Sequence, residues 1–363
     1  MSRFLSAELA GLVPYTPGEQ PQSGAGEPAY IKLNTNENPY PPSPAVRRLM
    51  QDLADKPAGQ LRLYSDPEAR EPRREIAAFY GLQPENVYVG NGSDEVLALA
   101  FLAFGKGRQV AFPDVTYAFY SVYAALYGLK TRIVPLDADF NIQPTDYLQP
   151  ERPEMVVLAN PNAITGKNLP LTVLEQILQA HPNDMVLIDE AYVDFGGESA
   201  AALLPQYENL LVVQTLSKSR SLAGARVGLA LGRPEVIADL NTIKFSFNPY
   251  NVNRISLALA AAAVHDKEYF AECRQKIMAA REFTAQGLSD LGFEVLPSLA
   301  NFVLARHDKV AGSLLYRELK ERGILVRWFD EPRIRDFVRI TIGTHEEMQR
   351  LLVAVSEILQ EVA

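Results

Sequence analysis

The apolar residues between about residue 43 and residue 264 follow two alternating patterns. Short apolar runs, typical of buried strands, are separated by stretches whose apolar residues recur at helical spacing. The predicted strands are residues 87–89, 109–112, 130–135, 155–159, 185–188 and 210–215. The predicted helices are residues 44–56, 67–80, 93–104 and 117–127. Strands that alternate with helices predict an α/β domain built on a mostly parallel sheet with flanking helices.

The pattern changes after about residue 265. A long charged helix at residues 267–291 precedes four short apolar runs and a closing helix at residues 345–362. The four apolar runs are residues 293–296, 302–304, 325–327 and 338–340. The first 30 residues are rich in Pro, Gly and Gln and predict an irregular arm that packs against the last domain. We therefore predict three parts: an N-terminal arm (1–42), a large domain (43–264) and a smaller α+β domain (265–363).

Charge and composition narrow the classes of function. The chain has 363 residues, 47% of them hydrophobic, and a net charge of −9, which argues against a nucleic-acid or anionic-membrane partner. The single cysteine, Cys273, cannot form an internal disulfide, and a reducing cytoplasm is expected. The four histidines lack ligand spacing, so we expect no metal site. Neither a signal peptide nor a membrane span is predicted, and the Ala-rich piece at residues 256–264 is too short to cross a bilayer.

Polar residues follow the predicted strands at the strand ends, where ligands gather in parallel-sheet proteins. They are the Gly-rich helix start at residues 90–95, the Asn-rich loop at residues 160–166, Asp189 with Tyr192, and Ser217 and Lys218 with the later Arg226. Taken singly, each has an ordinary structural interpretation. In the same order, the ordinary interpretations are a capped helix, a polar turn, a carboxylate in a buried ion pair and a surface lysine.

Together these residue types match the needs of pyridoxal phosphate. A lysine amine can form an imine with this cofactor, and a buried carboxylate such as Asp189 would keep the pyridine nitrogen protonated. Asn and Tyr side chains can donate hydrogen bonds to the anionic ring oxygen. The phosphate suits hydroxyls, an arginine and a helix N-terminus. Tyr117, which follows the strand at residues 109–112, could stack on the ring. The sequence therefore predicts a pyridoxal-phosphate site at these strand ends.

Motifs along almost the whole chain resemble those of fold-type I pyridoxal-phosphate aminotransferases, and within them the histidinol-phosphate aminotransferase family. The matching segments are residues 13–18 (VPYTPG), 33–39 (LNTNENP), 64–67 (YSDP), 91–95 (NGSDE), 189–192 (DEAY), 215–218 (TLSK), Arg226, 249–253 (PYNVN), 301–304 (NFVL) and 338–343 (VRITIG). The resemblance implies a large domain with a mostly parallel seven-stranded sheet flanked by helices, and a smaller α+β domain. Sister families share most of these motifs, so the superfamily is matched more specifically than the substrate.

The resemblance also implies a role for each candidate residue in binding the cofactor. Lys218 is the lysine that forms the imine and moves the proton, while Asp189 pairs with the pyridine nitrogen. Tyr192 and Asn162 are implied to donate to the ring oxygen, and Tyr117 to stack on the ring. The implied phosphate ligands are Ser217, Arg226 and the backbone of Ser93 and Asp94. Of these, Lys218, Asp189 and Tyr192 form the implied catalytic set.

Two further implications concern the dimer partner and the substrates. In the family, the residue matched by Tyr64 reaches the phosphate of the neighbouring subunit's cofactor, which implies a homodimer with shared active sites. The N-terminal arm is then expected to contact the partner as well as the small domain. The residues implied to bind substrate are Tyr15, Asn36, Arg327 and Arg339.

The loop at residues 160–166 departs from the family pattern. The family loop usually ends in Pro-Thr-Gly after an Asn or Ala, whereas Ile164 replaces that proline here. A loop without the fixed φ of proline is less rigid. Which asparagine of this loop contacts the cofactor therefore stays open.

The family resemblance implies L-histidinol phosphate as the amino donor and 2-oxoglutarate as the acceptor, with imidazole acetol phosphate and L-glutamate as products in histidine biosynthesis. Guanidinium groups can bind the phosphate ester and both carboxylates of glutamate. In a second interpretation, Arg327 is a surface residue and Arg339 alone binds an α-carboxylate. That version favours an aromatic aminotransferase, with Phe119, Tyr123 or Trp328 as an apolar wall.

Two other classes of function remain as alternatives. A decarboxylase that acts on phosphothreonine would share the fold and the cofactor. A binding or regulatory protein could keep the fold without catalysis, but it would not need an intact set of Asp189, Tyr192 and Lys218. Neither a basic arm nor a spare domain is visible in the sequence.

Overall fold

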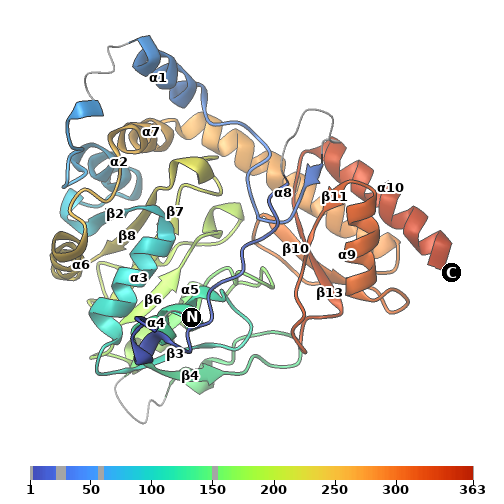
Figure 1. The fold of residues 1–363 in the computed structure, drawn as a ribbon, viewed down its shortest axis with the longest axis horizontal. Coiled ribbons are helices and arrows are strands. Elements are labelled where there is room, and N and C mark those ends of the chain that lie inside the picture. The colour runs from blue at the N-terminus through green and yellow to red at the C-terminus, as the bar shows by residue number, and fades with distance from the viewer. Residues whose placement is uncertain (1–2, 22–29, 56–60, 149–153, 363) are drawn as a thin grey trace.

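The computed structural model describes residues 3–21, 30–55, 61–148 and 154–362. Its large sheet has seven strands (Figure 1). In spatial order they are β2 (Val87–Gly90), β8 (Gly228–Gly232), β7 (Leu210–Thr215), β6 (Val186–Asp189), β5 (Glu154–Ala159), β3 (Gln109–Pro113) and β4 (Lys130–Val134). All neighbours are parallel except β8, which runs antiparallel to both β2 and β7. The predicted α/β fold with a mostly parallel seven-stranded sheet is confirmed.

Both faces of this sheet are buried because its strands carry apolar side chains at successive positions. In β5, for example, Val157 belongs to one core cluster while Val156 and Leu158 belong to the other. The first cluster includes residues of α3 (Gly92–Gly105), α4 (Phe119–Leu126) and α6 (Pro234–Phe247). The second includes residues of α1 (Pro44–Asp55), α2 (Arg70–Tyr80), α5 (Leu171–Ala180) and α7 (Arg254–His265). The sheet therefore forms the middle of three layers.

Strand β8 is missing from the sequence prediction. Its apolar run is only three residues long and lies between two glycines, which resembles a loop rather than a strand. Gly228 is needed for packing, because a Cβ at this position would lie 2.3 Å from the backbone nitrogen of Ser93. The strand thus brings the chain that follows Arg226 directly against the N-terminus of α3.

Residues 294–341 contribute the strands of a four-stranded antiparallel sheet. Its order is β12 (Arg327–Trp328), β13 (Phe337–Thr341), β10 (Phe302–Arg306) and β9 (Glu294–Val295). The helices α8 (Lys267–Asp290), α9 (Gly312–Glu321) and α10 (His345–Val362) pack around it (Figure 1). The predicted division at residue 265 falls at the last residue of α7 (Arg254–His265), just before α8. The predicted strand at 325–327 is divided, because β11 (Ile324–Leu325) pairs with the arm whereas Arg327 pairs with β13.

The N-terminal segment contacts both the part of the molecule around the large sheet and the part around the small sheet. Its strand β1 (Ile31–Lys32) pairs with β11 in parallel, and the carbonyl of Leu33 accepts a hydrogen bond from the backbone of Thr341 at 3.0 Å. Upstream, the ring of Tyr15 stacks on Phe119 of α4 at 4.3 Å between centroids. In Figure 1 this blue segment runs between the large sheet and the small one. Residues 33–38 are therefore placed where these two parts face each other.

Most helix bounds agree with the predicted ones to within two or three residues. The largest difference is at α2, which begins at Arg70 instead of residue 67. The carboxylate of Asp66 accepts from the backbone N–H groups of Glu68 and Arg70, which makes a turn before the helix. In the part of the chain that the structure describes, no helix has the length and apolar character to cross a membrane.

Candidate active site

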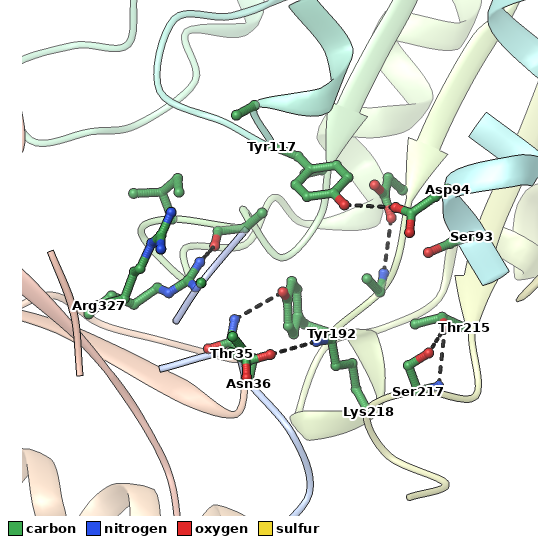
Figure 2. A pocket seen from close by; sticks show the side chains of 18 of the residues that line it. Thr35, Asn36, Ser93, Asp94, Tyr117, Tyr192, Thr215, Ser217, Lys218 and Arg327 are labelled. Carbon is green, nitrogen blue, oxygen red and sulfur yellow. Dashed lines mark hydrogen bonds between the residues drawn. The ribbon is translucent and has the colours of Figure 1, made fainter. Parts of the chain in front are cut away.

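A cavity of about 950 Å³, including its open mouth, lies beyond the carboxyl ends of β5, β6 and β7. The large sheet, the N-terminus of α3, the N-terminal segment and the small sheet all contribute to its walls (Figure 2). The predicted site residues that line it are Tyr15, Asn36, Ser93, Asp94, Tyr117, Asp189, Tyr192, Ser217, Lys218, Arg226, Arg327 and Arg339. Asn162 and Tyr64 are not among the lining residues.

Asp189 is the last residue of β6 and is 5% exposed. Its carboxylate accepts a hydrogen bond from the Tyr120 hydroxyl at 2.8 Å and another from the backbone of Ala191 at 3.2 Å. Burial raises the pKa of Asp189 to about 6, and no cationic side chain in the described ranges compensates its charge. A buried carboxylate without a cationic partner, at the wall of a cavity, fits the protonated nitrogen of a pyridine ring.

Lys218 follows β7, and its Nζ donates to the carbonyl oxygen of Thr35 at 2.9 Å. Burial, assisted by the positive charge of Arg339, lowers the pKa of Lys218 to about 8. An amine with this pKa is about half deprotonated at pH 8, compared with roughly one part in 300 for an unperturbed lysine. The side chain of Asn38 donates to the carbonyl oxygens of Lys218 and Ser219, at 3.0 and 3.2 Å. The geometry thus presents a partly neutral, well-positioned amine, which is the nucleophilic form.

Tyr192 lies three residues after Asp189 and is also buried. Its hydroxyl oxygen accepts a hydrogen bond from the side-chain nitrogen of Asn36 at 3.0 Å. Its ring packs edge-on against Phe302 of β10 at 5.1 Å between centroids. Burial raises the pKa of Tyr192, so the phenol stays protonated at neutral pH and can donate.

The side chains at the N-terminus of α3 form a second polar corner of the cavity. Ser217 lies beside it, with its hydroxyl oxygen accepting from Thr215 at 2.9 Å. Arg226, half exposed, donates to the carboxylate of Asp94 at 2.9 Å. Gly92 leaves room for this arginine, because a Cβ there would lie 2.5 Å from its Nη2 atom. A guanidinium, a hydroxyl and the free N–H groups of a helix start fit a phosphate group.

Tyr117 lies between this polar corner and the one formed by Asp189, Lys218 and Tyr192. Figure 2 shows its ring at the cavity wall. Its hydroxyl donates to the Asp94 carboxylate at 2.7 Å. Its ring meets that of Tyr120 edge to face, with 5.7 Å between centroids. These contacts hold the ring in place, as stacking on a cofactor would require.

Two arginines lie at the opposite end of the cavity. Arg327 of β12 and Arg339 of β13 are direct cross-strand partners, an arrangement that is unfavourable for like charges. Each guanidinium is held by backbone oxygens: Arg327 donates to Thr16 at 3.1 Å, and Arg339 to Ala163 at 2.8 Å. Burial lowers the pKa of Arg339. In the described ranges no carboxylate pairs with either arginine, so the pair predicts an anionic ligand.

The loop at residues 160–166 differs from the expected arrangement. The side-chain nitrogen of Asn162 donates to the carbonyl of Val115 at 2.9 Å, and its oxygen accepts from the backbone of Ile164 and Thr165. Asn160 likewise bonds the backbone of Leu169, just after the loop, instead of facing the cavity. The loop instead presents Pro161, Ala163 and Ile164 to the cavity. The geometry therefore favours Tyr192 over Asn162 as the donor to a ring oxygen. Asn162 serves to shape the loop.

Tyr64 is not brought to the cavity of its own chain. It is 76% exposed, and its ring stacks on Tyr250 at 4.3 Å between centroids. Its backbone oxygen accepts from Arg254 at 2.6 Å. The predicted role in a neighbouring subunit's site stays a prediction.

The three aromatic side chains predicted as an apolar wall for the alternative substrate are not among the residues that line the cavity. Trp328 turns away from Arg327, because successive residues of a strand face opposite sides, and its indole donates to the Arg335 carbonyl at 2.7 Å. Phe119 lies beneath Tyr15, and Tyr123 is buried. None of the three lines the cavity, whose apolar side chains include Ile164 and Phe329.

The residues of the site that were not predicted include three that contact predicted ones. Tyr120, which bonds Asp189, could have been noticed from the aromatic-rich stretch at residues 117–127. Phe329 lies two residues after Arg327, the spacing that places strand side chains on the same face. The guanidiniums of Arg327 and Arg339 lie over its ring, at 5.2 and 5.4 Å from the centroid. Thr35 acts on Lys218 through a backbone oxygen, which leaves no signal in the residue type.

Comparisons with known proteins agree with this arrangement. Residues 28–355 match the family described as aminotransferase class I and II. Over 360 residues, the chain is 51% identical to a histidinol-phosphate aminotransferase from a Marinomonas species, covering 98% of this chain and 99% of the relative. It is 49% identical over 360 residues to histidinol-phosphate aminotransferase 1 of Bradyrhizobium diazoefficiens, covering 99% and 100%.

The fold is likewise similar to that of solved structures. One is a histidinol-phosphate aminotransferase from Sinorhizobium meliloti, solved in complex with pyridoxal-5′-phosphate. The two structures superpose with a TM-score of 0.81 at 26% sequence identity, and the match covers 92% of each chain.

Proposed function

Because the chain belongs to the class I and II aminotransferases, we propose that it is a pyridoxal-phosphate-dependent transaminase. It moves the amino group of L-histidinol phosphate to 2-oxoglutarate and releases imidazole acetol phosphate and L-glutamate, a step of histidine biosynthesis. The observation that carries the choice of substrate is the pair of guanidiniums at Arg327 and Arg339, which no carboxylate in the described ranges neutralises. The names of the relatives support the same substrate.

The other end of the cavity fits the cofactor. Asp189 would hold the pyridine nitrogen, Tyr192 the ring oxygen, and Ser217 with Arg226 and the start of α3 the phosphate. When bound, pyridoxal phosphate supplies a carbonyl for an amine and a sink for the electron pair of the broken C–H bond. The lowered pKa of Lys218 lets its Nζ act as that amine at mildly alkaline pH.

The protein's own contribution to catalysis is to position groups and to move one proton. Lys218 Nζ would take up and release the proton that leaves the substrate carbon. The negative charge of Asp189 favours the protonated pyridine, which makes the electron sink stronger. The two arginines bind the phosphate of the first substrate and then a carboxylate of the second, since each anion accepts a bidentate fork.

We predict that Arg327→Ala lowers kcat/KM for histidinol phosphate by about 10²-fold, the loss expected for hydrogen bonds to a charged group. The activity with histidinol, which lacks the phosphate, should change little. Arg327→Lys should lie between, because it keeps the charge without the fork. The measurement compares histidinol phosphate, histidinol, phenylalanine and tyrosine with 2-oxoglutarate as acceptor.

A matched control for this experiment is Arg335→Ala. Arg335 is exposed, lies eight residues further on and pairs with Asp330 instead of lining the cavity. The substrate assignment fails if phenylalanine equals histidinol phosphate, or if Arg327→Ala leaves the preference unchanged. Release of CO2 from phosphothreonine would point to the decarboxylase instead.

The same proposal includes a homodimer with shared active sites. Tyr64 and Tyr250 form an exposed aromatic stack, and Leu61 and Leu63 beside Tyr64 are also exposed, at 63% and 52%. Exposed aromatic and aliphatic side chains that gather in this way suit a contact with a second copy. A cytoplasmic location, predicted from the sequence, stays a prediction.

Mixing two inactive variants tests the shared sites. In a heterodimer of Lys218→Ala and Tyr64→Ala chains, one of the two sites would contain an intact Lys218 and the partner's intact tyrosine. When equal amounts of the two variants exchange subunits at random, about half of the dimers are heterodimers, and each has one intact site of two. The mixture should therefore regain roughly a quarter of the wild-type activity. If Tyr64 served its own subunit, every site would carry a lesion and no activity would return. Mixing without subunit exchange is the control.

A further inference from the structure

A buried chain of hydrogen bonds connects the small sheet to the hydroxyl of Tyr192. The backbone N–H of Asn36 donates to Thr341 Oγ1 at 3.0 Å, and the Thr341 hydroxyl donates to Asn36 Oδ1 at 2.9 Å. Asn36 Nδ2 then donates to the Tyr192 oxygen at 3.0 Å. Asn36 and Thr341 are only 1% and 2% exposed. Figure 2 shows Asn36 and Tyr192 meeting at the cavity wall.

The direction of each hydrogen bond in this chain follows from the partners that are present. Thr341 Oγ1 already accepts from the Asn36 backbone, so its own proton needs an acceptor, and Asn36 Oδ1 provides it. If the Asn36 amide were reversed, a buried hydroxyl proton would have no partner, which is costly. Asn36 must therefore present its nitrogen to Tyr192. The Tyr192 oxygen is then an acceptor on this side, and its proton is left for the cavity side.

The position of Asn36 is itself fixed by further contacts. Its backbone is left-handed, with φ of 58°, a conformation that asparagine tolerates better than most residues. Its carbonyl accepts from the side chain of Asn301 at 3.0 Å, and Asn301 is fully buried. Asn36 is thus held by Thr341 of the small sheet and by Asn301 in the turn before β10. Tyr192, in contrast, follows β6 of the large sheet.

We propose that Thr341 and Asn36 are positioning residues that set the direction of the Tyr192 hydroxyl, so that its proton is available in the cavity for an anionic ring oxygen. This inference rests on the proposed function, because the anionic oxygen belongs to pyridoxal phosphate. The charged and titratable groups that face Tyr192 are Arg339, Asp189, Tyr15 and Lys218. All four are unchanged in the variants below.

The test is a pH titration of the visible absorbance of the cofactor bound to the holoenzyme. A phenol that donates to the ring oxygen stabilises its anionic form, and the loss of that donor makes the oxygen more basic. Tyr192→Phe should shift the titration upward by about one pH unit, the size of one hydrogen bond to a charged group. Thr341→Val should shift it in the same direction by a smaller amount, and Thr341→Ser should restore it. The double variant should show no more than the shift of Tyr192→Phe alone.

Two further variants make the result specific. Thr284→Val removes another fully buried threonine hydroxyl, one that bonds the Ala280 carbonyl within α8, and it should leave the titration unchanged. Asn36→Gly keeps the left-handed backbone accessible and removes the donor. It should shift the titration upward even if Thr341→Val does not fold.

An unshifted titration in a folded Thr341→Val or Asn36→Gly holoenzyme would overturn the inference. So would a double variant in which the shifts of Thr341→Val and Tyr192→Phe add. A wild-type protein that binds no pyridoxal phosphate would instead refute the proposed function. The dissociation constant of the cofactor, measured on the same variants, provides a second readout that does not depend on turnover.

Discussion

Replacing Lys218 with alanine is expected to lower turnover by at least about 10⁴-fold, because the variant loses both the nucleophilic amine and the group that moves the proton. In the structure the Lys218 amine lies partly buried at the cavity, hydrogen-bonded to the Thr35 carbonyl, with a pKa lowered to about 8. Alanine also leaves the Thr35 carbonyl without its partner. Cofactor should still bind through Asp189 and Arg226, although without a covalent link.

Reduction with borohydride, followed by mass analysis, measures the covalent link directly. Lys244→Ala is the matched control, since Lys244 is also buried and donates to a backbone carbonyl, that of Pro67, but does not line the cavity. The Lys244 variant should retain the reducible link, and the Lys218 variant should lack it. A reducible link in Lys218→Ala protein would show that another lysine carries the cofactor.

Replacing Asp189 with asparagine is expected to have the second largest effect. Asparagine has nearly the same shape but no charge, so the protonated pyridine nitrogen would lose its counter-ion in a buried place. We expect cofactor affinity to fall by about 10²-fold or more, in line with the cost of breaking a buried charge pair. Turnover of the remaining holoenzyme should fall as well, because an unprotonated ring is a weaker electron sink.

The neighbouring carboxylate offers a sharp control for this prediction. Glu190 is equally buried and has a pKa raised to about 7, but it accepts from Ser199, Ala200 and Gln214 and does not line the cavity. Glu190→Gln should leave cofactor affinity within a few-fold of the wild type. If Asp189→Asn transaminates at nearly the wild-type rate, the charge of Asp189 is not what supports the sink.

Local patterns in the sequence were sufficient to predict six of the seven strands of the large sheet and one end of the site. Short continuous apolar runs and a helical period between them indicate which segments are strands, and parallel strands place their carboxyl ends at one edge. Asp189 and Lys218 follow two such strands directly, so their proximity could be expected before the structure. Family motifs added the substrate-binding residues by position, which the periodicity alone would not have identified.

Contacts between distant segments decided what local patterns could not indicate. Strand β8 is recognisable only from its neighbours, because Gly228 permits it to approach the backbone of Ser93. Arg327 and Arg339 are separated by a turn in the sequence, and only the pairing of β12 with β13 makes them direct partners. The Asn162 amide bonds the Val115 carbonyl and the backbone of its own loop, and no residue pattern reveals which of several partners an amide will choose.

The sequence by itself therefore determined the fold class, the strand ends at which chemistry is possible and the residue types that match pyridoxal phosphate. The tertiary structure decided the pKa of Lys218 and of Asp189, since both shifts come mainly from burial among residues far away in the chain. It also decided the direction of the Tyr192 hydroxyl, which depends on a bond between residues 305 positions apart. Hydrogen-bond direction and desolvation are properties of an assembled environment, and they exist only once the chain has folded.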